Sequence, residues 1–390
     1  MRCVKKVSIV TPFYPPDPGG IAVHVHELAN RLTKLGVRCQ VISCFKGFCS
    51  SSFHEKVNEK LEVIRVVSAT PIHFPETMKS FRIPFYSTLI RDELLSFDPD
   101  VIHLHGHHYP ISWLIAFDQK MKNIPKILTM HGMYALNPYQ EGGKSVVEGI
   151  FNQSLLRVLL KKINGIIALT PTMAKYISKY TDRPIFVIPN GVDLELFQKN
   201  LKKKYEYRNE FDLPQDKKIV LFRGRFNYVK GIVEYTYVAA LLSRLRKGLY
   251  FLAVGDGSYS QFVKEMFEKY IDGCVMSWTP YEHLHKLYIA SDIYVLPSKW
   301  EALPITLIEA MASELVIVAT GISTIVDVLR DYPKKVLIER STVRDLFNGI
   351  KKALLLNQYD YIDRNKLYKY DWKQIIGKIY RLYCIVSSRC

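Results

Sequence analysis

Short apolar runs alternate with amphipathic segments along the whole chain. The first run, Val7–Thr11, is short and β-branched, which is typical of a buried strand. Prolines and glycines then interrupt the chain, and from Ile21 apolar residues recur at helical spacing until Gly36. After Asp193 the same alternation starts again. Strands are predicted at Val7–Thr11, Val37–Ser43, Leu61–Val67, Val101–Leu104, Lys126–Met130, Gly165–Leu169 and Ile185–Ile188, and then at Lys218–Phe222, Leu249–Val254, Gly273–Ser277, Ile293–Leu296, Leu315–Ala319 and Lys335–Ile338.

This order of elements predicts an α/β protein with two Rossmann-like domains, because strands separated by helices form doubly wound parallel sheets. We place the domains at residues 1–192 and 193–370, and interpret the basic stretch Lys199–Arg208 as a linker or surface helix. The tail, 371–390, has helical spacing and is expected to pack back on the first domain. Ligands of open α/β sheets bind beyond the carboxyl ends of the strands, so two domains facing each other would place two ligand sites across one cleft.

The composition is that of an ordinary folded protein, with 390 residues, 48% hydrophobic and 23% charged. We expect neither a signal peptide nor a membrane-spanning helix, and therefore a cytoplasmic location. Lys and Arg number 54 against 37 Asp and Glu, a net charge of +17. The excess is spread evenly, since residues 1–190 carry 23 basic and 14 acidic side chains. Nucleic acid, an anionic membrane surface or a phosphate-bearing small molecule are possible partners. The seven cysteines lack C-x-x-C spacing and are interpreted as reduced thiols.

The loop Thr11–Gly20 follows the first predicted strand and opens a helix. Gly19 and Gly20 allow close backbone approach, and the start of the helix offers free N–H groups to an anion. The loop is not G-x-G-x-x-G, and no acidic residue ends the second strand, which argues against a dinucleotide-dependent oxidoreductase. A turn without any ligand is the alternative.

A basic loop follows the strand Lys218–Phe222. It reads Arg223-Gly-Arg225, with Lys230-Gly231 a few residues further on. Arg can bind phosphate oxygens with two parallel hydrogen bonds, and Lys adds a point charge. Together these cations could neutralise a diphosphate without a metal ion. The alternative is a solvated basic turn.

Two glutamates stand in the segment E-A-L-P-I-T-L-I-E, which follows the strand Ile293–Leu296. Pro304 suits the first turn of a helix, so Glu301 is placed in the loop and Glu309 on the helix. A carboxylate on an apolar helix face needs a partner, and a ribose diol can donate two hydrogen bonds to it. Backbone N–H groups near Leu303 and Ile305 would face a phosphate. The alternative is an exposed Glu301 and a helix-terminal Glu309.

In combination these motifs resemble the retaining glycosyltransferases of the GT-B fold, specifically glycosyltransferase family 4. The resemblance runs from about residue 5 to 320. Its pieces are Thr11-Pro-Phe-Tyr-Pro-Pro with Gly19-Gly20 and His24, Thr129-Met-His131-Gly132, Val187-Ile-Pro-Asn190-Gly191-Val-Asp193, Arg223-Gly-Arg225 with Lys230-Gly231, Gly255-Asp-Gly257, and Pro297-Ser298 through Glu301 to Glu309-Ala-Met.

The resemblance implies a role for each matching residue. Arg225 and Lys230 would hold the donor diphosphate, and Glu309 would bind the ribose. Glu301, with backbone from Ala302 through Leu303 to Pro304, would contact the donor sugar and distal phosphate. The remaining assignments are His131 against the sugar near the reacting carbon, Gly20 at the phosphate and acceptor side, and Ser277 to Pro280 beside the base. Such enzymes need no divalent metal and no cofactor besides the nucleotide-sugar donor. This chain departs from the family pattern at Thr324, where glutamate is usual, and at Ala302, where glycine is frequent.

Two further patterns could suggest metal ions. Asp98-Pro-Asp100 fits a D-x-D motif, but it precedes a strand and is interpreted as a polar strand entry. His103 and His105 face the same side of a strand, so zinc could use them, with His107 and His108 nearby. Polar residues lining a cleft, or core histidines with satisfied hydrogen bonds, are the simpler interpretation. No metal site is therefore predicted.

The leading hypothesis is a retaining, metal-independent hexosyltransferase that uses a nucleotide-diphosphate sugar. Its acceptor would be a glycan or a lipid-linked sugar at an anionic membrane surface, on the inner face, with no nucleic acid involved. Basic amphipathic segments at Ile72–Phe97 and Ile150–Ile163 motivate the membrane contact; core helices with solvated basic faces are the alternative. Two other functions stay open, a nucleotide-sugar epimerase on the same fold and a basic RNA- or membrane-binding protein without catalysis.

Overall fold

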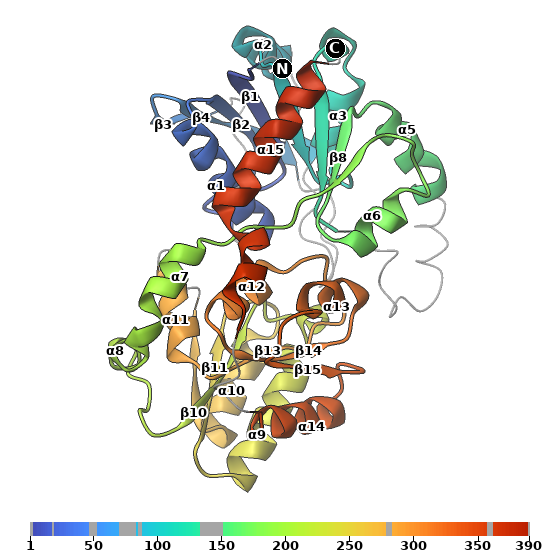
Figure 1. The fold of residues 1–390 in the computed structure, drawn as a ribbon. Helices are drawn as coiled ribbons and strands as arrows, with labels where there is room; N and C mark the ends of the chain where they lie inside the picture. Colours follow the sequence, from blue (N-terminus) through green and yellow to red (C-terminus); the bar gives the residue numbers. More distant parts are fainter. Residues whose placement is uncertain are drawn as a thin grey trace. The chain divides into compact units, whose positions relative to one another are not determined.

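The computed structural model describes residues 3–17, 19–46, 53–69, 83–84, 88–132, 151–277, 283–356 and 362–388. The chain divides into two compact units, each built around its own sheet (Figure 1). The first unit comprises Met1–Asn190 with Lys373–Cys390, and the second comprises Gly191–Trp372. The sequence placed both boundaries two residues away from these positions.

In the first unit, the described strands form a single sheet in the order β3-β4-β2-β1-β6-β7-β8-β9, with β5 paired to β4. All neighbours are parallel except β3 and β5, which run antiparallel to β4. The strands are β1 (Lys6–Thr11), β2 (Arg38–Lys46), β3 (Phe53–Asn58), β4 (Leu61–Ala69), β5 (Ile83–Pro84), β6 (Val101–His105), β7 (Lys126–Met130), β8 (Gly165–Ala168) and β9 (Ile185–Val187).

The two antiparallel strands are absent from the sequence prediction, which expected parallel strands throughout. Every residue of β3 is exposed, so its FHEKVN segment shows no apolar run to mark a strand. β5 is only two residues long. Both lie on the outer side of β4, where an edge strand needs backbone pairing and little burial.

The helices of the first unit cover this sheet, and α1 buries its apolar stripe of Ala22, Val25, Leu28, Ala29 and Leu32. The helical segments are α1 (Gly20–Lys34), α2 (Thr88–Phe97), α3 (Pro110–Phe117), the 3-10 turn η1 (Gln119–Met121), the π-helical η3 (Phe151–Leu156), α5 (Arg157–Lys161) and α6 (Pro171–Ile177).

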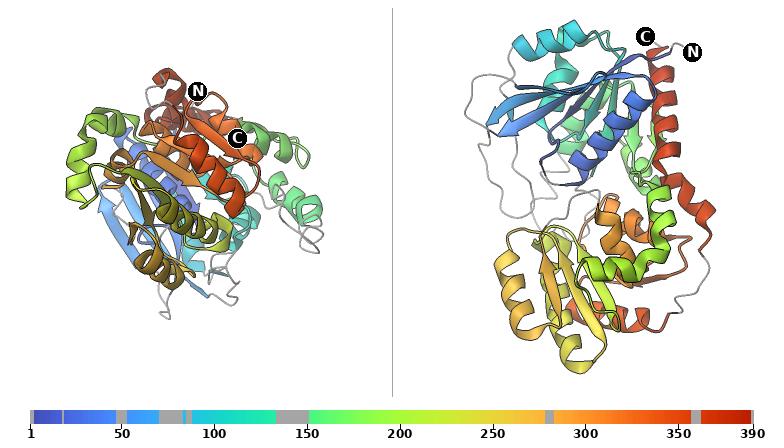
Figure 2. Two further views of the ribbon diagram at one scale, coloured as in Figure 1. Left: turned by 90° about the horizontal axis from the view of Figure 1, so that it is seen from below. Right: turned by 90° about the vertical axis from the view of Figure 1, so that its left-hand side faces the viewer.

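The C-terminal helix α15 (Trp372–Ser387) runs along the first unit, as the sequence predicted (Figures 1 and 2). Tyr380 donates a hydrogen bond to the Val4 carbonyl at 3.2 Å. The Tyr383 hydroxyl lies 2.7 Å from Nδ1 of His103, in the middle of the sheet. The last helix of the chain is therefore part of the first unit's core.

The second unit has a six-stranded parallel sheet in the order β12-β11-β10-β13-β14-β15. Its strands are β10 (Lys218–Arg223), β11 (Leu249–Val254), β12 (Gly273–Met276), β13 (Ile293–Leu296), β14 (Val316–Thr320) and β15 (Lys335–Ile338). The helical segments are α7 (Leu194–Asn200), η4 (Leu201–Lys203), α8 (Lys204–Glu210), η5 (Tyr228–Lys230), α9 (Ile232–Leu245), α10 (Ser260–Tyr270), α11 (Leu284–Ala290), α12 (Ile305–Ala312), α13 (Ser323–Leu329), α14 (Val343–Ala353) and η7 (Arg364–Tyr370).

The basic stretch Lys199–Arg208 is more than the linker or surface helix that its polarity suggested. Arg208 is 3% exposed, and its guanidinium donates to the Asp292 carboxylate at 2.7 Å. Asp292 lies directly before β13 and also accepts from Lys204 at 2.6 Å. These ion pairs attach α8 to the sheet, so its charged residues stabilise the unit's packing.

Candidate active site

The basic loop lies at the carboxyl end of β10, as the sequence predicted. Arg223 is the last residue of that strand, and Arg225 is half-buried in the loop after it. The loop passes close to the backbone that follows β11. A Cβ on Gly255 would lie 1.9 Å from the carbonyl oxygen of Gly224, and one on Gly257 would lie 2.4 Å from that of Phe226. Glycine at both positions therefore lets the two loops touch and fixes the loop that carries Arg225.

The 3-10 turn η5, directly before α9, presents Lys230 to the loop that follows β13. Gly231 has φ 72°, and a Cβ there would lie 2.2 Å from the Pro297 carbonyl oxygen. The Lys230 ammonium donates to Oε1 of Glu301 at 2.5 Å, and the Ser298 hydroxyl donates to the same oxygen at 2.8 Å. The structure therefore brings together two predicted catalytic residues of opposite charge, 71 positions apart in the chain.

Glu309 has a protein partner that the sequence analysis did not foresee. Its side chain is 2% exposed on α12, and its Oε2 accepts from Arg223 at 2.7 Å and from the Tyr288 hydroxyl at 2.8 Å. The expectation that Arg223 contributes its charge to a diphosphate is wrong for this structure, since that charge faces Glu309. Ribose is likewise not needed to explain a carboxylate in this apolar helix. Both of these hydrogen bonds are to Oε2 of Glu309.

Arg223 remains charged in this setting. Burial lowers the pKa of its guanidinium, but the Glu309 carboxylate and the Tyr288 hydroxyl raise it, and the net pKa lies above the ordinary value. Burial raises the pKa of Tyr288 well above its usual range, so the phenol stays protonated and donates. Three hydrogen bonds connect Arg223, Tyr288 and Glu309 and fix the Glu309 carboxylate.

The residues around the start of α12 hold the loop that carries Glu301. Thr324, where the family usually has glutamate, donates its hydroxyl to the Glu301 carbonyl at 2.8 Å and is fully buried. Leu303 is buried, and Pro304 is the residue before the first helical residue, one position earlier than expected.

Ser277, which was predicted to lie beside the base, follows β12 and is exposed. The other residues of that prediction, 278–280, lie outside the described residues.

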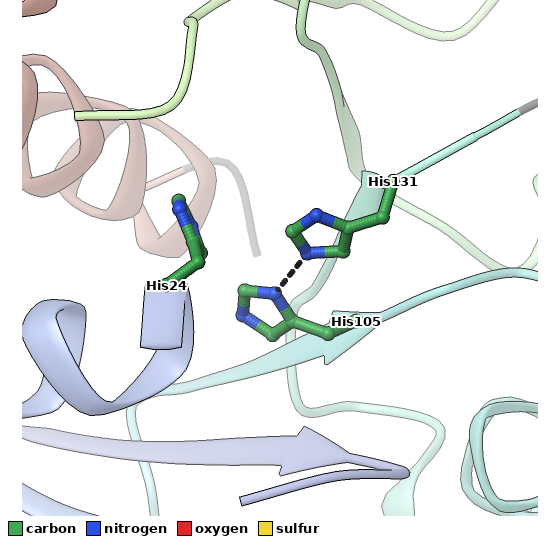
Figure 3. A group of neighbouring side chains, drawn as sticks. All are labelled: His24, His105 and His131. Carbon is green, nitrogen blue, oxygen red and sulfur yellow. Dashed lines mark hydrogen bonds between the residues drawn. The ribbon is translucent and has the colours of Figure 1, made fainter. Parts of the chain in front are cut away.

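In the first unit, three histidines from three different elements come together (Figure 3). His24 lies on α1, His105 ends β6, and His131 follows β7. His105 Nδ1 lies 2.8 Å from His131 Nε2. The ring centre of His24 is 5.6 Å from the ring centre of His105 and 5.2 Å from that of His131. The sequence quoted His24 only as part of a motif, because nothing in the chain order shows that it meets the other two.

Burial keeps these histidines neutral. It lowers the pKa of His24 to about 4, and it lowers the pKa values of His105 and His131 well below the usual range, with neighbouring histidines adding to the effect. At neutral pH each ring therefore has one N–H and one lone pair. The cluster can accept and donate hydrogen bonds, but it does not add positive charge.

The sequence analysis considered a zinc site that uses His103 and His105, with His107 and His108 nearby. The structure does not arrange His103, His107 and His108 in this way. His103 uses both ring nitrogens, one with Tyr383 and one with Thr129 at 2.7 Å. It is thus a core histidine with satisfied hydrogen bonds. The rings of His107 and His108 lie against each other at an angle of 44°, with ring centres 3.6 Å apart. Asp100 accepts from the Lys5 and Lys6 amides at the amino end of β6, which fits the predicted polar strand entry.

Gly20 is the first residue of α1 and is exposed, and Gly19 before it has φ 129°. A side chain is strained in that backbone conformation, so glycine here shapes the start of the helix.

The segments suggested for membrane contact are only partly described. Residues 70–82 and 85–87 lie outside the described residues, and so does residue 150. Among the described residues, no helix is long and apolar enough to cross a membrane.

Two family models together span most of the chain. The model described as Glycosyltransferase Family 4 matches residues 18–196, and the model described as Glycosyl transferases group 1 matches residues 203–373. With the two α/β units, these matches define a glycosyltransferase of the GT-B fold. The chain belongs to glycosyltransferase family 4, as its motifs indicated.

Named relatives cover most of this chain at low identity. It is 22% identical to the GPI3 subunit of phosphatidylinositol N-acetylglucosaminyltransferase from Saccharomyces cerevisiae, over 98% of this chain and 83% of that protein. It is 24% identical to phosphatidyl-myo-inositol mannosyltransferase from Mycobacterium tuberculosis, over 98% and 97%. The solved structure of sucrose-phosphate synthase from Thermosynechococcus elongatus has a TM-score of 0.79 at 18% identity, over 99% and 100%. HepE from Anabaena, in complex with UDP and glucose, has a TM-score of 0.69 at 15% identity, over 97% and 99%.

Proposed function

We propose that this glycosyltransferase moves a hexose from a nucleoside diphosphate sugar to a glycan or lipid-linked acceptor, with retention at the anomeric carbon. The observation that supports this best is the arrangement at the carboxyl ends of β10 and β13. Half-buried Arg225 and the ammonium of Lys230 lie on one side, and the carboxylates of Glu301 and Glu309 lie on the other. Cations suit a diphosphate leaving group, and carboxylates suit sugar hydroxyls.

The chemistry of the donor side follows from this arrangement. Breaking the bond between the sugar and the diphosphate places growing negative charge on the departing phosphate, which Arg225 and Lys230 stabilise. Glu301 holds the Lys230 ammonium in place before the donor arrives. Oε1 of Glu309 accepts from the ribose while Arg223 and Tyr288 hold Oε2. His131, which is neutral, is proposed to contact the sugar near its reacting carbon through a ring nitrogen.

A donor screen tests the proposal directly. UDP-, GDP- and ADP-hexoses are added to the purified protein, and thermal stabilisation and slow donor hydrolysis are measured. One nucleotide series should raise the unfolding temperature and be hydrolysed. NMR of the transfer product then gives the anomeric configuration. Accumulation of an epimerised donor without acceptor would support the epimerase alternative, and binding of RNA with no donor binding would support the non-enzyme alternative.

We expect transfer to continue in excess chelator. The loop cations supply the charge that a divalent ion provides in metal-dependent glycosyltransferases, and the D-x-D segment lies at the amino end of β6. Initial rates are measured with and without EDTA and after adding Mg²⁺ or Mn²⁺. Rates within about two-fold of each other are expected. Strict dependence on an added ion contradicts the proposed mechanism.

The acceptor is proposed to lie at an anionic membrane surface on the cytoplasmic side. The two relatives named above carry phosphatidylinositol in their names, which supports a lipid-linked acceptor. Within the predicted segment Ile150–Ile163, Leu156, Leu159 and Leu160 are buried in the core, so most of its apolar face is not available. Leu155 and Val158 are 49% and 44% exposed, next to the cations of Arg157 and Lys161.

Sedimentation with liposomes measures this contact. Vesicles containing phosphatidylserine should bring down the protein at low salt, and neutral vesicles should not, because each Lys or Arg near an anionic surface contributes about 1 kcal/mol. Leu155→Ser with Val158→Ser should weaken the binding. A matched pair on an exposed face of the second unit, Leu241→Ser with Leu245→Ser, serves as the control. Equal, negligible sedimentation with both vesicles favours a soluble acceptor.

A further inference from the structure

The three histidines of the first unit have the spacing of a metal site. The third pair of ring centres, His105 and His131, is 5.1 Å apart, so the three rings form a nearly equilateral triangle. One potential ligand atom from each residue lies within 4.8 Å of the others. A zinc ion about 2.1 Å from one nitrogen of each ring would place the ring centres roughly 5 Å apart. The present spacing therefore needs little change to surround an ion.

The two closest nitrogens already point at each other. His105 Nδ1 and His131 Nε2 share one hydrogen at 2.8 Å, and both lie on the side where the rings converge (Figure 3). An ion can take the place of this hydrogen, which then moves to another nitrogen of its ring. His105 loses little by this change, since its Nε2 is buried without a hydrogen-bond partner among the described residues.

The surroundings decide which ions fit. All three potential ligands are imidazoles, each of which can offer a ring-nitrogen lone pair to a metal ion. The described residues add no carboxylate or thiolate to this group. Imidazole suits Zn²⁺, Co²⁺, Ni²⁺ and Cu²⁺, whereas Mg²⁺ and Ca²⁺ prefer oxygen. His131 is partly exposed, so the group is not sealed from solvent.

We propose that His24, His105 and His131 form a three-histidine site for one transition-metal ion such as Zn²⁺, and that the bound ion inhibits transfer by occupying His131. A water molecule or an anion would complete the tetrahedral coordination. Binding rests on the geometry of the first unit alone. Only the inhibition rests on the proposed role of His131, so the two are measured separately.

Binding is tested by calorimetry on the metal-free, full-length protein at pH 7.5, with Zn²⁺, Co²⁺ and Mg²⁺ as probes. We expect one Zn²⁺ per chain, no Mg²⁺, and visible Co²⁺ bands typical of nitrogen ligands. His24→Gln and His105→Gln should each weaken Zn²⁺ binding at least about ten-fold. His26→Gln, on the same helix but bonded to Tyr14 and Asn30, is the matched control and should bind normally.

Several results would overturn the site. These are no Zn²⁺ binding by the wild type, unchanged binding by a folded His24→Gln variant, or Co²⁺ bands typical of thiolate ligands. Because His24 and His105 lie on different elements, either variant decides the question if the other fails to fold. In the activity arm, Zn²⁺ should inhibit transfer, and chelator should restore it. Zn²⁺ bound at this site without inhibition would overturn the assigned effect on His131.

Discussion

Lys230→Ala and Arg225→Ala are each expected to lower the rate of sugar transfer by about 10²–10³-fold, the usual effect of removing one preorganised charge from a leaving group. Lys230 has a defined position, because its ammonium is held by Glu301 at 2.5 Å and its loop is fixed by Gly231 against Pro297. The charge is thus in place before the donor binds. The transfer rate at saturating donor and the donor dissociation constant are the two quantities to measure.

Lys230→Ala has a second effect, because it leaves the Glu301 carboxylate, which is 6% exposed, with Ser298 as its remaining side-chain donor among the described residues. The double variant Lys230→Ala with Glu301→Gln removes this unpaired charge. If it folds normally and transfers sugar more slowly than Glu301→Gln alone, the additional loss belongs to the missing cation. Lys269→Ala, on an exposed turn of α10, is the control for charge. Near-normal transfer in both single variants would remove Arg225 and Lys230 from the mechanism.

Glu309→Gln should have two measurable consequences, weaker donor binding and lower stability. It leaves a charged, buried Arg223 with no carboxylate opposite it, and breaking a buried ion pair in this way costs about 3–5 kcal/mol. Donor binding should weaken because Oε1 of Glu309 is proposed to accept from the ribose. Urea unfolding gives the stability, and calorimetry with the nucleoside diphosphate gives the affinity.

A double variant separates the two effects. Arg223→Met with Glu309→Leu replaces the ion pair by apolar groups of similar size, and such replacements are often neutral for stability. Stability should return towards the wild-type value, whereas donor affinity should stay low. Glu301→Gln is the comparison, since it should mainly slow transfer. Wild-type donor affinity in the double variant would show that Glu309 does not bind the ribose.

The sequence by itself determined the two-unit α/β plan and the family. Strands that are buried on both faces of a parallel sheet consist of short apolar runs. The positions of β1, β10 and β13 could therefore be predicted from the order of apolar residues along the chain. The positions of Arg225, Lys230 and Glu301 after strand ends also followed, because the carboxyl ends of parallel strands are where loops with ligand contacts lie. Exposed β3 left no such signal, since every one of its residues is exposed and the strand is held mainly by backbone pairing to β4.

Only the tertiary structure decided which charges face each other. Arg223 ends β10 and Arg225 lies two residues later in the loop, yet the first is paired with Glu309 and Tyr288, 86 and 65 positions further along the chain. Likewise His24, His105 and His131 meet because α1, β6 and β7 converge. The local periodicity of the sequence predicts which side of a helix or strand is buried. The partner of a buried polar group depends instead on how segments distant in the chain pack against each other. This packing follows from the order of the strands in the sheet.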